Sequence, residues 1–265
     1  MQNLDIILKG AIKIAQAAAE VILQVYHHEA FQVQMKSDAS PLTIADERAN
    51  DIICKMLMEL TPDIPIISEE NIEIEYQDRR HFKYFWSVDP LDGTKEFVKR
   101  NGEFTVNISL LENNIPILGV IAVPVQQSVY YAVKNQGSYC LKNGAVQKII
   151  CSIFRLTDTG LRVPISRSYI SEKTNALIAA YNHPVLSPTG SALKFMYLAE
   201  GHLDIYPRVG TTMEWDTAAA QIILEEAGGQ LLDLQTRQPL RYNKVSLKNP
   251  DFIAHGTILN SGENN

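Results

Sequence analysis

The hydrophobic positions in the first sixty residues recur at helical spacing. Apolar side chains follow this spacing from residue 4 to residue 27, which predicts an amphipathic helix. Thr43 then has the features of an N-cap, with Asp46 three residues later as in a capping box. We expect a second helix from this cap to about residue 60, ended by Pro62, which lacks a backbone N–H. The residues expected on its inner face are Ile52, Ile53, Met56 and Leu60.

The pattern changes to strands in the middle of the chain. Short strands are predicted at 64–68 and 84–88, and a longer β run at 104–133. After about residue 150, strand and helix patterns alternate. The later predictions are strands at 163–166 and 203–206 and helices at 171–182, 191–201 and 217–229. We interpret residues 1–150 as an α+β domain and residues 151–265 as an α/β domain packed against it.

Composition limits the possible partners. The chain has 265 residues, of which 46% are hydrophobic and 20% charged, an ordinary globular mixture. Its net charge of -6 provides no basic field for nucleic acid, so an anionic ligand needs a local cationic site. The three cysteines are scattered, which argues against a disulfide framework and against a zinc site.

The beginning of the chain shows no secretory pattern. It lacks a basic segment followed by a small-residue cleavage signal, and Lys13 and Glu20 interrupt the apolar early stretch. We therefore expect no transmembrane segment and a cytoplasmic location, with peripheral association at the inner face of the cell membrane left open.

Acidic residues stand at the ends of predicted elements. Asp46 lies in a first helical turn, Glu69 follows a strand, Asp89 and Asp92 follow the next strand, and Asp216 precedes a helix. Such positions often carry ligand-binding groups in α/β proteins. Carboxylates gathered there would repel one another without a cation, and oxygen ligands suit Mg²⁺.

The segment DPLDGT at 89–94 can fold its two carboxylates toward one point. Pro90 fixes one φ and Gly93 permits a tight turn. The carbonyl of Leu91 can face the same point, and Thr94 can begin a helix. Taken singly, each acidic piece has a plainer interpretation as a polar turn, a helix cap or a solvated pair.

Four ordered motifs resemble the lithium-sensitive phosphatase superfamily, which includes the inositol monophosphatases. They are SPLTIAD (40–46), ISEE (67–70), VDPLDGTKEF (88–97) and EWDTAAAQIILEEAGG (214–229). The resemblance extends over nearly the whole chain and is greatest to the bisphosphate nucleotidase branch, through the further segments GEFTVNISL, ISRS, GSALKF and YPRVG. It implies a layered α-β-α-β-α sandwich and inhibition by Li⁺.

The resemblance also implies the metal ligands. Glu69, Asp89 and the carbonyl of Leu91 would bind one Mg²⁺, and Asp89, Asp92 and Asp216 a second, with two or three ions per site. Two such ions about 4 Å apart can lower the pKa of water and stabilise the leaving oxygen. Asp46 and Thr94 would form the pair that orients and helps deprotonate the attacking water.

The same resemblance implies the substrate contacts. The reacting phosphate would lie against Glu69, Leu91, Asp92, Gly93, Thr94 and Asp216. Ser191, Lys194 and Arg208 would hold the nucleotide and its 5'-phosphate, since a cation suits that group. Arg167 and Ser168 are further candidates. For Lys194 and Arg208 the plainer interpretation is a solvated surface charge.

The substrate is predicted from differences between branches. Inositol enzymes usually have Thr-Asn-Phe after DGT and a glutamate seven positions before the last aspartate, whereas this chain has Lys-Glu-Phe and Val209. Thr189-Gly190 and Ala192 are small departures from the nucleotidase pattern, and Val209 stands where an aromatic is expected.

These features predict hydrolysis of the 3'-phosphate of adenosine 3',5'-bisphosphate, and of its 5'-phosphosulfate analogue, in sulfur metabolism. One alternative is an inositol or fructose-bisphosphate phosphatase, and another is a non-catalytic metal and nucleotide sensor. The pair of Asp46 and Thr94 favours an enzyme, because a sensor does not need to activate water. We expect a monomer or a homodimer with no nucleic-acid partner.

Overall fold

The computed structural model describes residues 3–27, 33–35, 41–71, 74–167 and 171–259, with only the backbone at 33–35, 41 and 42. Its largest element is a seven-stranded sheet with the order β3-β4-β5-β6-β7-β8-β9. The first two strands are parallel, and every later neighbouring pair is antiparallel. The strands are β3 (Ile66–Ser68), β4 (Tyr84–Asp92), β5 (Thr105–Glu112), β6 (Ile115–Val123), β7 (Ser128–Val133), β8 (Ser138–Lys142) and β9 (Ala145–Ile149).

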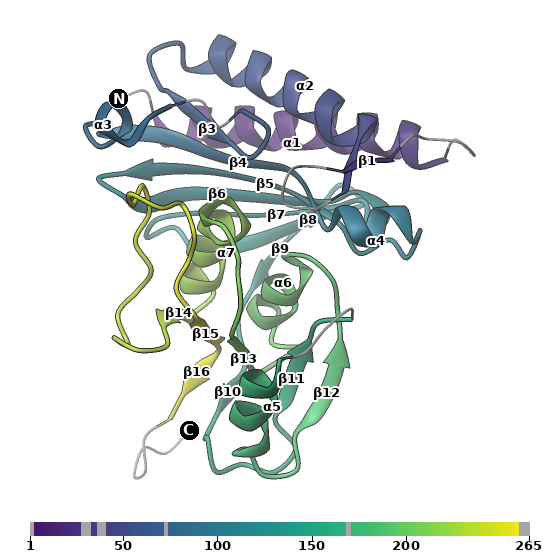
Figure 1. Cartoon of the computed structure of the whole chain (residues 1–265), viewed down its shortest axis with the longest axis vertical. Helices are drawn as coiled ribbons and strands as arrows, with labels where there is room; N and C mark the ends of the chain where they lie inside the picture. Colours follow the sequence, from purple (N-terminus) through teal and green to yellow (C-terminus); the bar gives the residue numbers. More distant parts are fainter. Residues whose placement is uncertain (1–2, 28–32, 36–40, 72–73, 168–170, 260–265) are drawn as a thin grey trace.

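Both faces of this sheet are covered by helices (Figure 1). Along β5, Val106, Ile108 and Leu110 enter a core with α1 (Leu4–His27) and α2 (Ile44–Leu60), whereas Leu111 enters the core on the other face. That second core contains α6 (Leu193–Ala199) and α7 (Glu214–Glu226). Strand alternation therefore buries both sides of the sheet.

Smaller sheets lie beyond α6 and α7. They are β13-β15-β14, which is antiparallel, and the parallel pairs β11-β12 and β10-β16. Tyr206 of β13 faces α6, while Ile205 of the same strand packs with Ile178 of α5 (Glu172–Ala179) on the opposite face. The strands are β10 (Ile153–Phe154), β11 (Arg162–Ile165), β12 (Val185–Pro188), β13 (Ile205–Arg208), β14 (Gln230–Asp233), β15 (Phe252–His255) and β16 (Thr257–Ile258).

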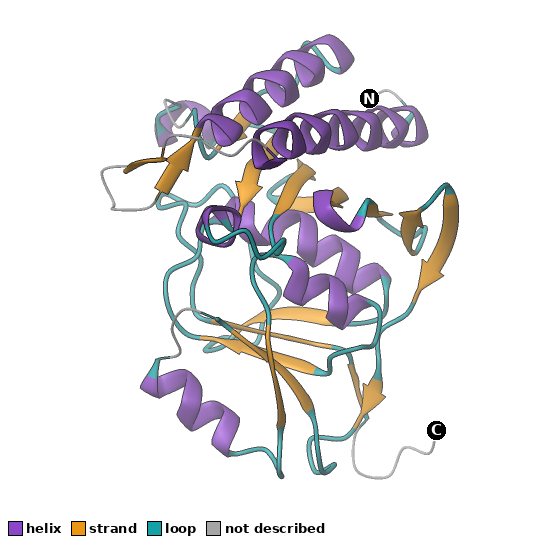
Figure 2. Ribbon diagram, turned by 90° about the vertical axis from the view of Figure 1, so that its right-hand side faces the viewer, coloured by secondary structure: helices purple, strands orange, loops and turns teal. Residues whose placement is uncertain are grey.

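The order of layers confirms the predicted α-β-α-β-α sandwich. It runs from α1 and α2 through the large sheet, α6 and α7, and the smaller sheets to α5 (Figures 1 and 2). The remaining elements are β1 (Val33–Met35), β2 (Pro41–Thr43), α3 (Tyr76–Arg79), α4 (Thr94–Val98) and a 3-10 turn, η1 (Pro124–Gln126).

Several predicted elements need correction. The hairpin β8–β9 was not predicted, because four of the five residues of β9 are exposed and lack an apolar alternation. The last helix, α7, begins at Glu214 rather than at residue 217, so Asp216 lies in its first turn. The predicted inner face of α2 is confirmed. Ile53 is buried, and Ile52, Met56 and Leu60 are partly buried against the same core. The face also includes Ala45, Ala49 and Leu57.

Candidate active site

The motif DPLDGT continues β4 and then turns sharply into α4. The pairing of β4 with β5 shifts register between Asp89 and Asp92, and Gly93 follows with a φ of +91°. A Cβ on Gly93 would lie 2.9 Å from the carbonyl oxygen of Glu103 and 3.0 Å from the Cβ of Ser191. Glycine is therefore required both by the backbone conformation and by close packing.

Thr94 and Asp46 are in direct contact. The Thr94 hydroxyl lies 3.1 Å from Oδ1 of Asp46 and 3.3 Å from the carbonyl oxygen of Leu91, either of which can accept its proton. The other carboxylate oxygen of Asp46 accepts from the backbone N–H of Thr43 at 2.8 Å and from its hydroxyl at 2.7 Å. The predicted capping box thus also fixes the carboxylate that faces Thr94.

Three aspartates of the acidic cluster, of which Asp89 is buried and the other two are partly buried, each use one side-chain oxygen to accept a backbone N–H. Asp89 accepts from Leu91 at 3.0 Å, and Asp216 accepts from Met213 at 2.8 Å. Asp92 accepts from Ala192, at the entry to α6. These bonds fix the carboxylates and leave each with a second oxygen for another ligand.

The electrostatics of this cluster are unfavourable for carboxylates alone. Burial, followed by the charges of Glu69, Asp92 and Asp216, raises the pKa of Asp89 well above its ordinary value. Burial raises the pKa of Asp92 to about 6, although Lys194 opposes the rise. The pKa of Asp216 is also raised, first by burial and then by Asp92. Carboxylates from three segments are therefore close enough to repel one another.

The donor set suits a hard divalent cation. Its groups are buried or partly buried carboxylates and a backbone carbonyl, and the ionised forms need positive charge nearby. Among the described residues, no three His, Cys, Asp or Glu side chains already form a group that could hold a metal.

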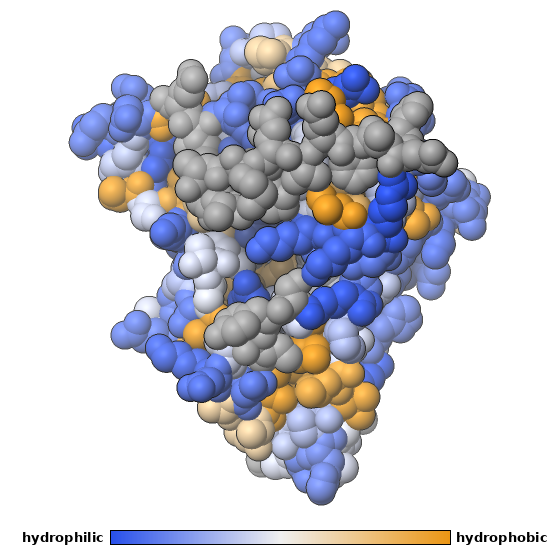
Figure 3. All heavy atoms as spheres, turned by 45° about the vertical axis from the view of Figure 1, so that its right-hand side comes forward, coloured by the Kyte–Doolittle hydropathy of each residue, from blue (hydrophilic) through white to orange (hydrophobic). Residues whose placement is uncertain are grey.

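A cavity of about 630 Å³ opens beside the acidic cluster. It lies between the end of β4, α4, the entry to α6 and the end of β13, and its lining includes Asp92, Thr94 and Asp216. Figure 3 shows that the face where the upper and lower parts of the molecule meet is largely hydrophilic. The cavity joins two of the expected metal ligands, Asp92 and Asp216, to the expected substrate residues Ser191, Lys194 and Arg208.

Lys194 is not a solvated surface lysine. Its side chain is buried, its Nζ donates to the carbonyl oxygen of Ser191 at 3.0 Å, and it lies 5.7 Å from the ring centre of Tyr206. Burial lowers the pKa of Lys194 to about 8, although Asp92 opposes the change. A buried lysine at a cavity has few water molecules to hydrogen-bond its ammonium group. An anionic ligand in the cavity would supply the missing partner.

Arg208 and Val209 line the same cavity. The Nε of Arg208 is buried and has no hydrogen-bond partner among the described residues. A donor in this state carries a cost that an anionic ligand would remove. The side chain of Val209 offers no hydrogen bond to a sugar hydroxyl.

Arg167, a further candidate for holding the nucleotide, pairs with a carboxylate in this structure. Its guanidinium forms two bonds to the carboxylate of Glu103, at 2.5 Å and 2.6 Å, outside the set of residues that line the cavity. Ser168, the other candidate from ISRS, lies outside the described residues.

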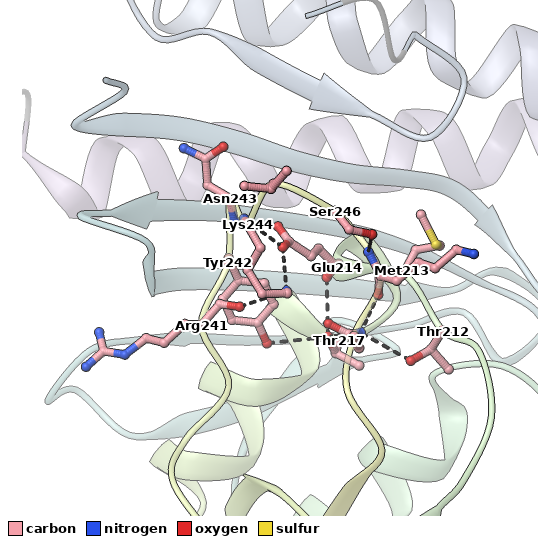
Figure 4. A network of polar contacts seen from close by, with 12 residues as sticks. Thr212, Met213, Glu214, Thr217, Arg241, Tyr242, Asn243, Lys244 and Ser246 are labelled. Carbon is pink, nitrogen blue, oxygen red and sulfur yellow. Dashed lines mark hydrogen bonds and ion pairs between the residues drawn. The ribbon is translucent and has the colours of Figure 1, made fainter. Parts of the chain in front are cut away.

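A buried polar network holds the first turn of α7, which carries Asp216 (Figure 4). The Glu214 carboxylate accepts from the Nζ of Lys244 and from the backbone N–H groups of Lys244 and Asn243. Arg79, from the N-terminal half, donates to the side chain of Asn243 at 2.7 Å. The network therefore links α3, the 241–249 loop and the helix that carries Asp216.

Sequence reasoning missed three supporting residues, Glu103, Tyr206 and Glu214. The first two lie inside segments that carried the resemblance, GEFTVNISL and YPRVG, and the third begins the last motif. The available signal for such a supporting role was the presence of a charged residue or a tyrosine inside a segment that otherwise matches. Their partners are distant in sequence, so the signal could not identify their contacts.

Comparisons with known proteins identify the family of this chain. The model of the inositol monophosphatase family matches residues 3–263, so the chain belongs to this family. Members of the family are generally magnesium-dependent phosphatases. In addition, none of the helices within the described ranges is both long and apolar enough to cross a membrane.

Similar proteins are named as nucleotidases. The chain is 39% identical over 251 residues to the 3'(2'),5'-bisphosphate nucleotidase CysQ of Aggregatibacter actinomycetemcomitans, covering 93% of this chain and 91% of that protein. It is 40% identical over 250 residues to the CysQ of Escherichia coli (strain K12), covering 92% and 98%. The crystal structure of CysQ from Bacteroides thetaiotaomicron matches with a TM-score of 0.82 and 39% identity, covering 94% of this chain and 96% of that one.

Proposed function

We propose that this chain is a magnesium-dependent 3'(2'),5'-bisphosphate nucleotidase that converts adenosine 3',5'-bisphosphate to AMP and phosphate. One observation carries the proposal: Thr94, which bonds to Asp46, borders the same cavity beside the acidic cluster as the two cations Lys194 and Arg208. The similarity to proteins named CysQ supports the same substrate class.

In this proposal the acidic cluster binds magnesium. Glu69, Asp89 and the carbonyl of Leu91 would hold one ion, and Asp89, Asp92 and Asp216 a second. Magnesium, when bound, supplies positive charge that neutralises the phosphoryl oxygens and lowers the pKa of water.

Asp46 and Thr94 act on the attacking water. The Thr94 hydroxyl accepts a hydrogen bond from the water and passes its own proton toward Oδ1 of Asp46. The water oxygen forms a bond to the 3'-phosphorus as one of its protons passes to the Thr94 oxygen. The bond from phosphorus to the 3'-oxygen breaks, and that oxygen takes up a proton from solvent. The backbone donors on Asp46 hold the carboxylate in place during this transfer.

Lys194 and Arg208 hold the 5'-phosphate. Both border the cavity that the acidic cluster opens into, and the buried Nε of Arg208 lacks a partner among the described residues. The 5'-phosphosulfate analogue should react as well, because its extra group lies beyond the 5'-phosphate. This contact distinguishes the proposal from an inositol phosphatase, which has no second phosphate to bind.

Release of phosphate from a substrate panel tests the proposal. The panel contains adenosine 3',5'-bisphosphate, the 5'-phosphosulfate analogue, inositol 1-phosphate and fructose 1,6-bisphosphate, each with Mg²⁺ and with chelator. We expect the two nucleotides to react faster than the sugar phosphates, and only with Mg²⁺. Faster hydrolysis of inositol 1-phosphate would overturn the substrate assignment, and no hydrolysis of any member would favour the sensor.

A further inference from the structure

We propose that Glu103 is a positioning residue that fixes the turn Thr189–Ala192 against the metal motif. The inference rests on the proposed function, because it concerns the same site. Glu103 lies in the loop between α4 and β5 and does not line the cavity. It acts on the site through the backbone of the turn that leads into α6.

The carboxylate of Glu103 joins three segments. Its Oε2 accepts from the backbone N–H of Gly190 at 2.8 Å and from the Nε of Arg167 at 2.5 Å. Its Oε1 accepts from the Nη2 of Arg167 at 2.6 Å. These bonds, together with the positive charge of Arg167, lower the pKa of Glu103 despite its partial burial. Glu103 is therefore charged and held in one orientation near neutral pH.

The backbone of the turn packs closely against the Glu103 loop. A Cβ on Gly190 would lie 2.8 Å from Cγ of Glu96 and 3.0 Å from the carbonyl oxygen of Glu103. A Cβ on Gly93 would lie 2.9 Å from the same carbonyl oxygen. Glu103 thus contacts the turn and the metal motif simultaneously, and neither glycine leaves room for a side chain.

The other end of the turn is attached to Asp92. Asp92 accepts from the N–H of Ala192, while Glu103 accepts from the N–H of Gly190. Ser191 lies between them with a φ of +45°, a conformation that a non-glycine residue rarely adopts unless its surroundings hold it. The carbonyl oxygen of Ser191 accepts a hydrogen bond from the Nζ of Lys194. Loss of the Glu103 contact should therefore disturb both Asp92 and Lys194.

A second ion pair in the chain serves as a control for the pair of Glu103 and Arg167, because it is expected only to stabilise the fold. Arg162 forms a similar paired contact with Asp204, at 2.9 Å and 2.5 Å. The arginine of each pair is 41% exposed. Neither Arg162 nor Asp204 lines the cavity, so loss of this pair should affect stability without affecting the turn.

The first experiment measures the turn without any substrate. Amide hydrogen exchange at Gly190 and Ala192 is followed by NMR in the parent protein, in Glu103→Ala and in Asp204→Asn. We expect Glu103→Ala to speed exchange at both amides about tenfold or more, because a charge-assisted bond is lost, and Asp204→Asn to leave them unchanged. Unchanged exchange at Gly190 and Ala192 in Glu103→Ala would overturn the proposal.

The second experiment measures kinetics with adenosine 3',5'-bisphosphate. We expect Glu103→Ala to raise the KM and the half-saturating Mg²⁺ concentration, lowering kcat/KM about tenfold. Glu103→Gln should recover most of the loss, because its amide oxygen can still accept from Gly190. Equal losses of kcat/KM in Glu103→Ala and Asp204→Asn would assign Glu103 a merely stabilising role. A parent protein inactive on the bisphosphate would refute the proposed function, and the exchange measurement would still decide the role of Glu103.

Discussion

Thr94 and Asp46 lie 48 positions apart in the sequence, yet their side chains meet at 3.1 Å. The same carboxylate caps the helix that begins at residue 44. Asp46 therefore has a structural role through one oxygen and faces Thr94 through the other. The two roles can be separated by experiment, because Thr94 takes part only in the second.

Thr94→Ala should lower kcat strongly while the KM and the Mg²⁺ requirement stay near those of the parent. Removal of a general-base function typically costs on the order of 10²–10⁴-fold. Asp46→Asn should show a similar loss, with a further destabilisation of about 1 kcal/mol from the weakened cap. Steady-state kinetics and thermal unfolding measure the two effects, and Thr94→Ser is the control that keeps the hydroxyl. If both variants lost only metal affinity, Asp46 would be a ligand or a cap and not part of a water-activating pair.

Mg²⁺ should stabilise the folded protein, and Asp89 should be central to this effect. An ion that binds only the folded state adds about 2.7 kcal/mol at one hundred times its Kd, which raises the Tm by roughly 5–10 °C in a chain of this size. Asp89→Asn should abolish most of the rise in Tm and most of the activity, because Asp89 is expected to ligate both ions.

The variant Asp89→Asn should not be less stable than the parent without metal. Its neighbours Glu69, Asp92 and Asp216 repel a charge at that position, and the substitution removes it. Thermal unfolding with Mg²⁺ and with chelator measures both effects, with the exposed Asp63→Asn as control. Full turnover by Asp89→Asn at ordinary Mg²⁺ would contradict the metal assignment.

The local parts of the site could be predicted because the conformation of each motif depends on residues within that motif. The capping box of Asp46 and the turn at Gly93 depend on residues that are neighbours in sequence. Contacts between distant segments left no local pattern. Glu103 is 87 positions from Gly190, and Glu214 is 30 positions from Lys244.

The fold shows the same division. Apolar runs separated by turn residues predicted β5, β6 and β7, which are buried on both faces, but not β9, which is largely exposed. The burial of Lys194 could not be predicted, because a lysine is usually exposed. Only the packing of α6 shows that this one is buried.

Arg79→Met should destabilise the protein, because it removes the donor that joins α3 to the 241–249 loop. Arg79 is buried and donates to the side chain of Asn243 and to the carbonyl oxygens of Lys244 and Val245. Leaving these acceptors without their charged donor should cost about 2–4 kcal/mol. Thermal unfolding measures the loss, and Arg80→Met, at the neighbouring exposed position, is the control. Equal Tm values for the two variants would show that the network does not stabilise the fold.

The role of Lys194 can be tested with two enzymes and two substrates. Lys194→Ala should lower kcat/KM for adenosine 3',5'-bisphosphate by roughly tenfold to a hundredfold, because a charge-assisted contact contributes about 1.5–3 kcal/mol. The loss should be much smaller with adenosine 3'-monophosphate, which has no 5'-phosphate to contact. Comparing the parent and the variant on both substrates gives a double-mutant cycle between enzyme and ligand.

The cycle also separates loss of a contact with the 5'-phosphate from a general disturbance of the site. Lys194 contacts the carbonyl oxygen of Ser191, so its removal could loosen the turn and slow both substrates alike. Lys194→Arg keeps a positive charge and should retain part of the preference for the bisphosphate, although the planar guanidinium fits a lysine site imperfectly. Equal losses on the two substrates would show that Lys194 supports the turn without contacting the 5'-phosphate. A selective loss on the bisphosphate, partly restored by Lys194→Arg, is the result we expect.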